Sequence, residues 1–194
     1  MNFLAHLVLS PGGEKIMAGN FFADRVKGNL WKTLEPSYAA GVLLHRRIDS
    51  FTDSHLRVKA AKQLLDPSYG LFRGVLLDVF WDHFLARDFA LYTEGLDPVH
   101  FAQDAHRVLS AHALVFHPQA GHIVQAMERG NWLLGYAEIA GVDRVLKQMA
   151  QRFPHNNPMA HGAKALESAY TELEEAFAGF WPDLKEEFGL YSLR

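Results

Sequence analysis

The sequence has 194 residues, a length that suits one domain with a substantial buried core. Its formal net charge of −3 at pH 7 argues against a general nucleic-acid-binding protein, because such proteins usually carry a strong basic excess. It contains no cysteine, which excludes disulfides and thiolate metal ligands. Any metal ion would therefore need nitrogen and oxygen ligands from His, Asp, Glu or Asn.

The amino-terminal stretch MNFLAHLVLSPGG lacks the basic segment that begins a secretory signal peptide, and His6 and Pro11 interrupt its apolar run. No apolar run in the sequence approaches the roughly 20 residues that a membrane-spanning helix needs. We therefore expect a cytoplasmic protein without membrane insertion.

Apolar residues recur at helical spacing and no alternating strand pattern is evident, so we expect an all-α fold with residues 1–194 in a single helical domain. Glycine and proline mark the ends of most expected helices. We expect a junction at 52–54, with Asp53 capping the helix that follows, and a break at Gly141. In chain order, the expected helices cover residues 2–10, 14–27, 36–51, a segment ending near 65, 70–92, 98–112, 121–129, 132–152 and 159–188.

Positive charge is concentrated in the first half of the sequence. Residues 1–92 carry 11 Lys and Arg against 9 Asp and Glu, whereas the remainder carries 8 against 13. Several acids of the first half belong to the polar pairs described next, so its outer surface should be more basic than these counts suggest. We expect a surface that attracts an acidic partner. Its candidate residues are Arg25, Lys27, Lys32, Arg46, Arg47, Arg57, Lys59 and Lys62.

Four pairs of polar residues, each four positions apart, occur in the first half of the sequence. Residues at this spacing lie above one another on a helix, so each pair can present two ligands to one point. Large apolar residues flank the pairs, which indicates that several of these polar side chains point into the protein. The pairs are Asn2 and His6, Asn20 and Asp24, His45 and Asp49, and Asp78 and Asp82.

Burial of these groups leaves two interpretations open. A carboxylate without a partner costs several kcal/mol to bury, so it must be paired, protonated or bound to a metal ion. Nearby Arg25, Arg46, Arg47 and Arg73 could form buried salt bridges with some of the acids. Since four such pairs occur within residues 1–83, we favour a shared divalent-metal site over salt bridges alone.

The four pairs lie in the segments MNFLAH (1–6), GNFFAD (19–24), HRRID (45–49) and DVFWDHFL (78–85). Together and in this order, these segments resemble the acyl carrier protein phosphodiesterases, while the second half of the chain matches only as a helical continuation. The resemblance implies a hydrolase that removes the 4′-phosphopantetheine arm from holo-acyl carrier protein. It also implies dependence on a divalent cation, typically Mn²⁺, with Mg²⁺ or Fe²⁺ as alternatives.

That family is similar in turn to the helical HD phosphohydrolases, so the resemblance implies an HD-like helical bundle. HD enzymes use an adjacent His-Asp pair, whereas this sequence has only the reversed order Asp82-His83, which leaves the individual ligands open. The resemblance implies metal ligands among His6, Asp24, His45, Asp49, Asp78 and Asp82. It implies catalytic roles for Asp24, His45, Arg46, Asp82 and His83.

The chemistry expected at such a site is attack of a metal-bound hydroxide on the phosphodiester, with release of the serine oxygen of the carrier protein. His83, or His45 if it is not a ligand, would protonate that oxygen. Arg46 or Arg47 would neutralise charge on the phosphate.

Two rival functions remain open at the level of the sequence. One is an HD-like phosphohydrolase that acts on a nucleotide or another small phosphoester. The other is a non-catalytic helical protein that binds an acidic partner and keeps its polar pairs as buried salt bridges. The basic first half favours a protein substrate over a small one, because acyl carrier proteins are strongly acidic.

Overall fold

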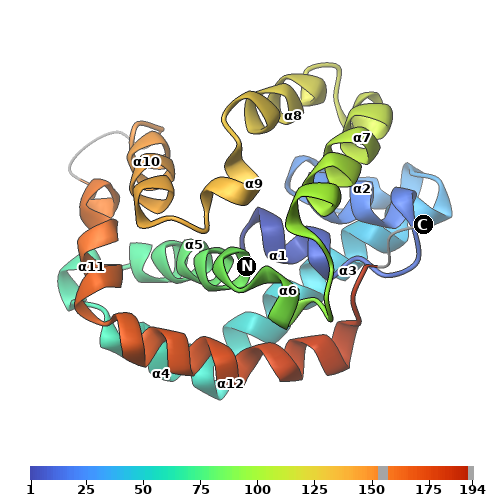
Figure 1. Ribbon diagram of the computed structural model, residues 1–194. Coiled ribbons are helices and arrows are strands. Elements are labelled where there is room, and N and C mark those ends of the chain that lie inside the picture. Colours follow the sequence, from blue (N-terminus) through green and yellow to red (C-terminus); the bar gives the residue numbers. More distant parts are fainter. Residues whose placement is uncertain (153–156, 192–194) are drawn as a thin grey trace.

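The computed structural model describes residues 1–152 and 157–191, and in these ranges the chain is helical, without strands (Figure 1). The expected all-α fold is therefore confirmed. Its α-helices are α1 (Phe3–Val8), α2 (Glu14–Phe22), α3 (Pro36–Ser54), α4 (Leu56–Leu64), α5 (Phe72–Arg87), α6 (Phe89–Tyr92), α7 (Pro98–Phe116), α8 (Ala120–Arg129), α9 (Trp132–Gly135), α10 (Ile139–Ala150), α11 (Gly162–Ser168) and α12 (Tyr170–Phe188). Short 3-10 turns are η1 (Ala23–Arg25), η2 (Leu30–Thr33), η3 (Pro67–Tyr69) and η4 (Pro158–His161).

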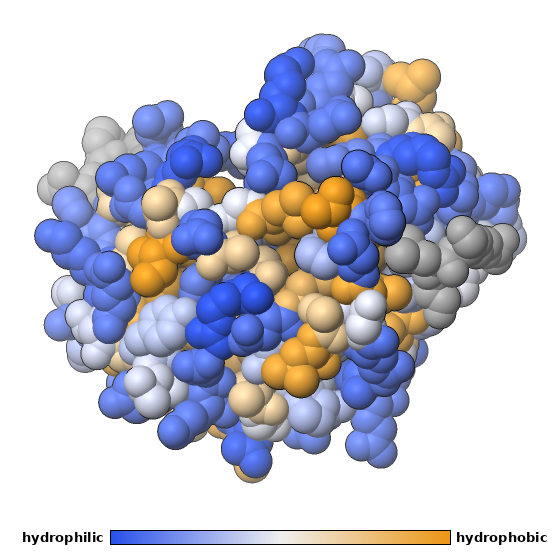
Figure 2. Space-filling view, in the orientation of Figure 1, coloured by the Kyte–Doolittle hydropathy of each residue, from blue (hydrophilic) through white to orange (hydrophobic). Residues whose placement is uncertain are grey.

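Helix α5 forms the centre of the fold, with α1, α4, α10 and α12 packed around it (Figure 1). Its sequence is apolar on nearly all sides, as expected for a helix that is surrounded by others. Trp81 and Phe84 are fully buried and contact Phe177 of α12, with ring centroids 5.5 and 5.9 Å apart respectively. Polar side chains cover most of the face in Figure 2, and apolar side chains show in a band across its middle.

Helices α2 and α3 pack closely against each other. A Cβ atom at Gly19 would lie 2.3 Å from the carbonyl oxygen of Tyr38, and one at Gly41 would lie 2.3 Å from that of Ile16. Only glycine permits backbones to approach this closely, so the two helices are in direct backbone contact. This contact places the second half of α2 beside the first two turns of α3.

Helix α1 is held in place by residues that are distant in the sequence. Two backbone N–H groups in its first turn, those of Leu4 and Ala5, have no partner within the helix. They donate to the two carboxylate oxygens of Asp82 on α5 at 2.8 and 3.0 Å. At its other end, the N–H of Tyr191 donates to the carbonyl oxygen of Val8 at 2.7 Å. Helix ends leave such groups without partners in the helix, and here they are satisfied by tertiary contacts.

Several expected helix boundaries were wrong. The expected helix over 14–27 ends as an α-helix at Phe22, and α3 continues through the expected junction at 52–54 to Ser54. Asp53 therefore lies inside α3. The ring of His55 caps α4 instead, since its Nδ1 accepts from the N–H of Arg57 at 3.2 Å.

Four other expected helices differ from the structure as well. The expected helix over 70–92 divides at Asp88, and that over 159–188 divides into α11 and α12 at Ala169. The helix expected to end at 112 continues to Phe116. Gly141 lies inside α10, and the break expected there falls before Ile139. Gly141 is needed for packing, because a Cβ atom there would lie 1.8 Å from the carbonyl oxygen of Gly135.

Within the described residues, no helix has both the length and the apolar character needed to cross a membrane.

Candidate metal-binding site

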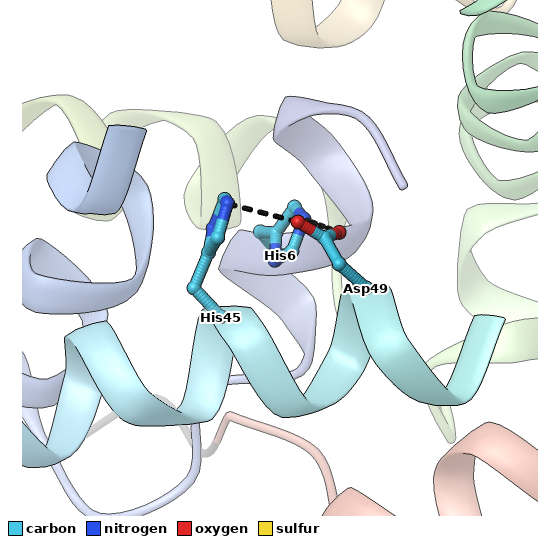
Figure 3. Close-up of side chains that lie close together, drawn as sticks. All are labelled: His6, His45 and Asp49. Carbon is cyan, nitrogen blue, oxygen red and sulfur yellow. Dashed lines mark ion pairs between the residues drawn. The ribbon is translucent and has the colours of Figure 1, made fainter. Parts of the chain in front are cut away.

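Two histidines and an aspartate from two helices converge beside α5. His6 comes from α1, while His45 and Asp49 lie one turn apart on α3 (Figure 3). The Asp49 carboxylate contacts both rings, with Oδ1 3.2 Å from His6 Nε2 and Oδ2 3.2 Å from His45 Nε2. The two imidazoles stack with centroids 4.0 Å apart. The three potential ligand atoms lie within 4.8 Å of one another, a spacing that one metal ion can span.

Asn20 on α2 determines which nitrogen of His6 carries the proton. Its Nδ2 donates to the carbonyl oxygen of His6 at 2.7 Å and to Ser10 Oγ at 2.8 Å, so its Oδ1 must face His6 Nδ1, 2.9 Å away. An amide oxygen only accepts, so His6 Nδ1 carries the hydrogen and Nε2 presents a lone pair. Metal-binding histidines commonly donate their other ring N–H to such an oxygen.

The lone pair of His6 Nε2 faces a carboxylate. Burial lowers the pKa of His6 to about 4, so the ring is neutral near pH 7. Nε2 is buried without a hydrogen bond, although Asp49 Oδ1 is only 3.2 Å away. Two electron-rich atoms at this distance attract each other only when a proton or a cation lies between them. The chemistry of these donors therefore fits a metal ion with nitrogen and oxygen ligands.

His45 has the opposite protonation behaviour. Burial lowers the pKa of His45, but Asp24 and Asp49 outweigh that effect and raise the pKa to about 9. Its Nε2 lies 3.6 Å from Asp24 Oδ1 as well as 3.2 Å from Asp49 Oδ2. Burial raises the pKa of Asp49, yet its contacts, above all with His45, hold that pKa far below its usual range. Without a metal ion, His45 is thus an imidazolium between two carboxylates.

Two further aspartates lie at the edge of this group. Asp24 follows α2 in η1, and its side chain is largely exposed. Asp78 on α5 lies 3.1 Å from the Met1 ammonium nitrogen, which is also 3.4 Å from Asp49 Oδ1. Carboxylates therefore surround a buried positive charge beside the histidines, and the region as a whole attracts cations.

The cluster opens into a cavity of about 290 Å³. His6, Asp24, His45 and Asp78 supply its acidic and imidazole side, and Arg152 lines it as well. A larger hollow of about 420 Å³ lies near η3 and α11 but has no histidine in its lining. The smaller cavity is the one that combines ligand atoms with room for a substrate group.

The structure does not bring Asp82 and His83 into the cluster. Both carboxylate oxygens of Asp82 accept backbone N–H groups of α1, and burial raises the pKa of Asp82 to about 7 despite these donors. His83 donates from Nδ1 to the carbonyl oxygen of Tyr136 at 2.8 Å, and its Nε2 accepts from the Tyr170 hydroxyl at 2.7 Å. Both residues hold helices together.

The arginines expected at the phosphate have other contacts. Arg46 donates to the carbonyl oxygens of Val26 and Gly28 at 3.0 and 2.9 Å, which ties the loop after η1 to α3. Arg47 forms an ion pair with Glu187 at 2.9 Å. Neither lines the cavity, whereas Arg152 does. No motif or spacing in the sequence singles out Arg152.

Comparison with known proteins assigns the family. The family model described as "Acyl carrier protein phosphodiesterase" matches residues 1–184. The chain belongs to the acyl carrier protein phosphodiesterase family. Curated members include one from Photorhabdus laumondii, 33% identical over 96% of this chain and 94% of the relative. Another, from Serratia proteamaculans, is 33% identical over 96% of this chain and 97% of the relative. A third, from an Enterobacter species, is 33% identical over 94% of each chain.

This assignment confirms the resemblance that was based on four short segments in the first half. It also extends it, because the match continues through α10, α11 and most of α12. Three of the four segments supply the cluster: MNFLAH contains His6, HRRID contains His45 and Asp49, and GNFFAD contains Asn20. No solved structure shows a significant match to the chain, so the likeness to HD phosphohydrolases stays a prediction.

Proposed function

We propose that this protein hydrolyses the phosphodiester that links 4′-phosphopantetheine to the serine of holo-acyl carrier protein. The products are apo-acyl carrier protein and free 4′-phosphopantetheine. Membership of the acyl carrier protein phosphodiesterase family and the names of relatives that span nearly the whole chain support this reaction. The observation in the structure that carries it is the buried His6 Nε2, which has no hydrogen bond and lies 3.2 Å from Asp49 Oδ1 beside an open cavity.

The proposal includes a divalent cation held by His6, His45 and Asp49, with Asp24 and Asp78 beside it. Nitrogen and carboxylate oxygen ligands suit Mn²⁺, with Mg²⁺ or Fe²⁺ as alternatives. When bound, such an ion lowers the pKa of a coordinated water and polarises phosphoryl oxygens. The fit rests on the donor set, whose members lie within 4.8 Å of one another.

The residues of the chain have distinct tasks in this proposal. Asn20 holds His6 in the tautomer that leaves Nε2 free to bind. His45 must lose the proton that it shares with Asp24 and Asp49 before its Nε2 can act as a ligand. Asp82 and His83, which the sequence placed in the same chemistry, position α1, α9 and α12 in this account.

The carrier protein would dock on exposed basic residues, two of which lie close in the chain to Asp24 at the cavity. Arg25 and Lys27 lie within three residues of Asp24 and are exposed. Among the described residues, neither forms an ion pair, nor does Lys59. The other predicted docking residues have partners or packing contacts. Lys62 pairs with Asp53, Arg47 pairs with Glu187, and Arg57 packs against Gly179. We therefore assign docking to Arg25, Lys27 and Lys59. The cytoplasmic location of the protein stays a prediction.

Mass spectrometry of the carrier protein tests the function directly. Incubation of holo-acyl carrier protein with enzyme and Mn²⁺ should lower its mass by the 4′-phosphopantetheinyl group. Chelation followed by removal of the chelator should abolish turnover, and added Mn²⁺ should restore it. Hydrolysis of a nucleotide but not of holo-acyl carrier protein would favour the small-phosphoester alternative. Full activity of thoroughly demetallated protein would exclude the metal site.

A further inference from the structure

Arg152 is a cationic side chain without a structural task in the described part of the chain. It follows the end of α10, it is exposed, and it lines the cavity that contains His6 and His45. Among the described residues, its guanidinium has no hydrogen bond or ion pair. An unpaired arginine that faces a phosphoryl-transfer site is available to bind phosphate oxygens, for which its planar, bidentate donors are well suited.

A small apolar groove of about 50 Å³ continues the cavity past Arg152. The groove and the cavity share Asn2, Phe3, Met149 and Arg152 in their linings, so the two spaces adjoin. Trp132 and Val145 complete the apolar wall. Phe3 and Trp132 stack with ring centroids 6.2 Å apart, which gives the groove a rigid aromatic side built from α1 and α9.

We propose that Arg152 and this groove bind the 4′-phosphopantetheine arm at its phosphate end. The guanidinium takes the phosphate oxygens, and the groove takes the dimethyl-substituted carbon next to the phosphate. This inference rests on the proposed function, because it assumes that the phosphodiester lies at the His6–His45–Asp49 cluster. It adds a binding site for the arm that is separate from the docking surface for the carrier protein.

Size and order of groups support this assignment. In 4′-phosphopantetheine, one methylene separates the phosphate from a carbon that carries two methyl groups. A groove of about 50 Å³ accepts a branched group of this size but not the whole arm. The order of the binding groups also matches the ligand. Arg152 lies where the cavity meets the groove, so a phosphate at Arg152 would place the dimethyl-substituted carbon in the apolar groove beyond it. Arg46 and Arg47 cannot take the same role while they hold Val26, Gly28 and Glu187.

The test of the guanidinium compares Arg152→Ala and Arg152→Lys with Arg144→Ala, an exposed arginine on α10 that does not line the cavity. Calorimetric titration with 4′-phosphopantetheine and with pantetheine, which lacks the phosphate, separates the two parts of the ligand. We expect Arg152→Ala to bind 4′-phosphopantetheine about 10–100-fold more weakly, since a charge-assisted hydrogen bond is lost. Its affinity for pantetheine should not change, and Arg144→Ala should behave as wild type.

The test of the groove uses Val145→Phe, which fills it, beside Val115→Phe on the exposed end of α7 as the control. Val145→Phe should weaken binding of both 4′-phosphopantetheine and pantetheine. It should leave unchanged the inhibition of holo-acyl carrier protein hydrolysis by inorganic phosphate. Melting curves identify variants that fail to fold. If folded Arg152→Ala and Val145→Phe bind both ligands as wild type does, the arm lies elsewhere and the inference is overturned.

Kinetics separate failure of this inference from failure of the proposed function. If wild-type protein cleaves holo-acyl carrier protein and Arg152→Ala keeps its KM and kcat, the function stands and the binding site is wrong. If wild-type protein does not cleave it but binds 4′-phosphopantetheine through Arg152, the function is wrong and the binding site stands.

Discussion

At the scale of single residues, Asn20 has the largest consequence for the chemistry. The sequence pairs it with Asp24, but the structure places its amide against His6 and the end of α1. Three acceptors around its Nδ2 leave one orientation of the amide, and that orientation leaves one tautomer of His6. A residue outside the proposed ligand set thus orients the lone pair on which the proposed metal site depends.

Substitutions on α3 distinguish a metal site from a buried salt bridge. We expect His45→Ala to reduce turnover by orders of magnitude, because it removes a ligand atom. Asp49→Asn should weaken metal binding by at least about 10–100-fold, the range found for groups that only support a ligand. Turnover, melting temperature and metal content should be measured on the same preparations.

Asp53→Asn is the matched control for these substitutions. It lies one turn beyond Asp49 on α3, and its exposed side chain pairs with Lys62 at 3.1 Å. Loss of a surface ion pair should cost no more than about 1 kcal/mol and leave turnover unchanged. His45 and Asp49 variants that stay folded and metal-loaded with wild-type turnover would show that α3 is scaffold only.

The raised pKa of His45 predicts how stability depends on pH in metal-free protein. The stabilising contacts of its imidazolium are fully present below the unfolded-state pKa of about 6.5. They are lost as the pH rises through the folded-state pKa of about 9. We therefore expect the free energy of unfolding to fall by a few kcal/mol over this window, and His45→Gln to lack this part of the fall. Denaturant titrations with a chelator present measure both proteins.

Metal affinity should show the opposite trend with pH. Binding through His45 Nε2 requires loss of its proton, so the affinity for Mn²⁺ should rise as the pH increases toward about 9. Titration of demetallated protein at several pH values checks this. An affinity that does not vary over this range would mean that His45 stays protonated and is not a ligand.

At the scale of elements, the contact between α2 and α3 sets the distance between Asn20 and His45. Helices normally pack with axes about 8–10 Å apart, and closer approach requires small residues at the crossing point. Gly19 and Gly41 meet at that point, with no room for a methyl group on either. The two glycines therefore bring Asn20, which orients His6, close to the α3 residues that we propose as metal ligands.

Gly41→Ala tests the importance of this crossing. The new Cβ atom would lie 2.3 Å from the carbonyl oxygen of Ile16, so the helices must separate. We expect a loss of about 1–3 kcal/mol or more in the free energy of unfolding, together with weaker metal binding. Gly121→Ala on α8, where nothing lies within 4 Å of the new Cβ atom, is the control. It should stabilise by roughly 0.5–1 kcal/mol because alanine favours a helix.

At the scale of the whole molecule, buried side chains from α1 to α12 form one hydrophobic cluster around α5. That residues 1–194 form a single domain stays a prediction, and the continuity of this cluster supports it. This cluster supports the helices that carry the charged residues of the candidate site. Arg25 and Lys27, which are close to Asp24 in the chain, and Lys59 on α4 are the unpaired cations that we assign to docking of the carrier protein.

Charge reversal tests that docking surface. Changing Arg25, Lys27 and Lys59 to Glu should slow association with holo-acyl carrier protein by about 10-fold or more at low salt, because steering of an acidic partner is lost. The difference should shrink as salt is added. Arg47→Glu should change the rate less, since Glu187 already offsets its charge. Stopped-flow kinetics measure the rates; equal effects of all reversals would place the docking surface elsewhere.

The sequence alone determined the helical class, the family and the pairing of His45 with Asp49. These depend on local information: apolar periodicity follows the helical repeat, and residues four apart on one helix share a face whatever surrounds them. Helix ends were less predictable. A glycine at position 141 indicated a helix break. In the structure Gly141 lies inside α10, where its missing side chain permits close contact with Gly135 of α9.

Only the tertiary structure decided which polar pairs meet. Asp78 and Asp82 share a face of α5, yet Asp78 lies beside the Met1 ammonium and Asp82 accepts from α1. Spacing in one helix fixes the angle between two side chains but not which distant segment packs against each of them. For the same reason Arg152, far from every motif, lines the cavity unforeseen. Its position depends on how α10 packs on α5, which involves contacts between residues far apart in the chain.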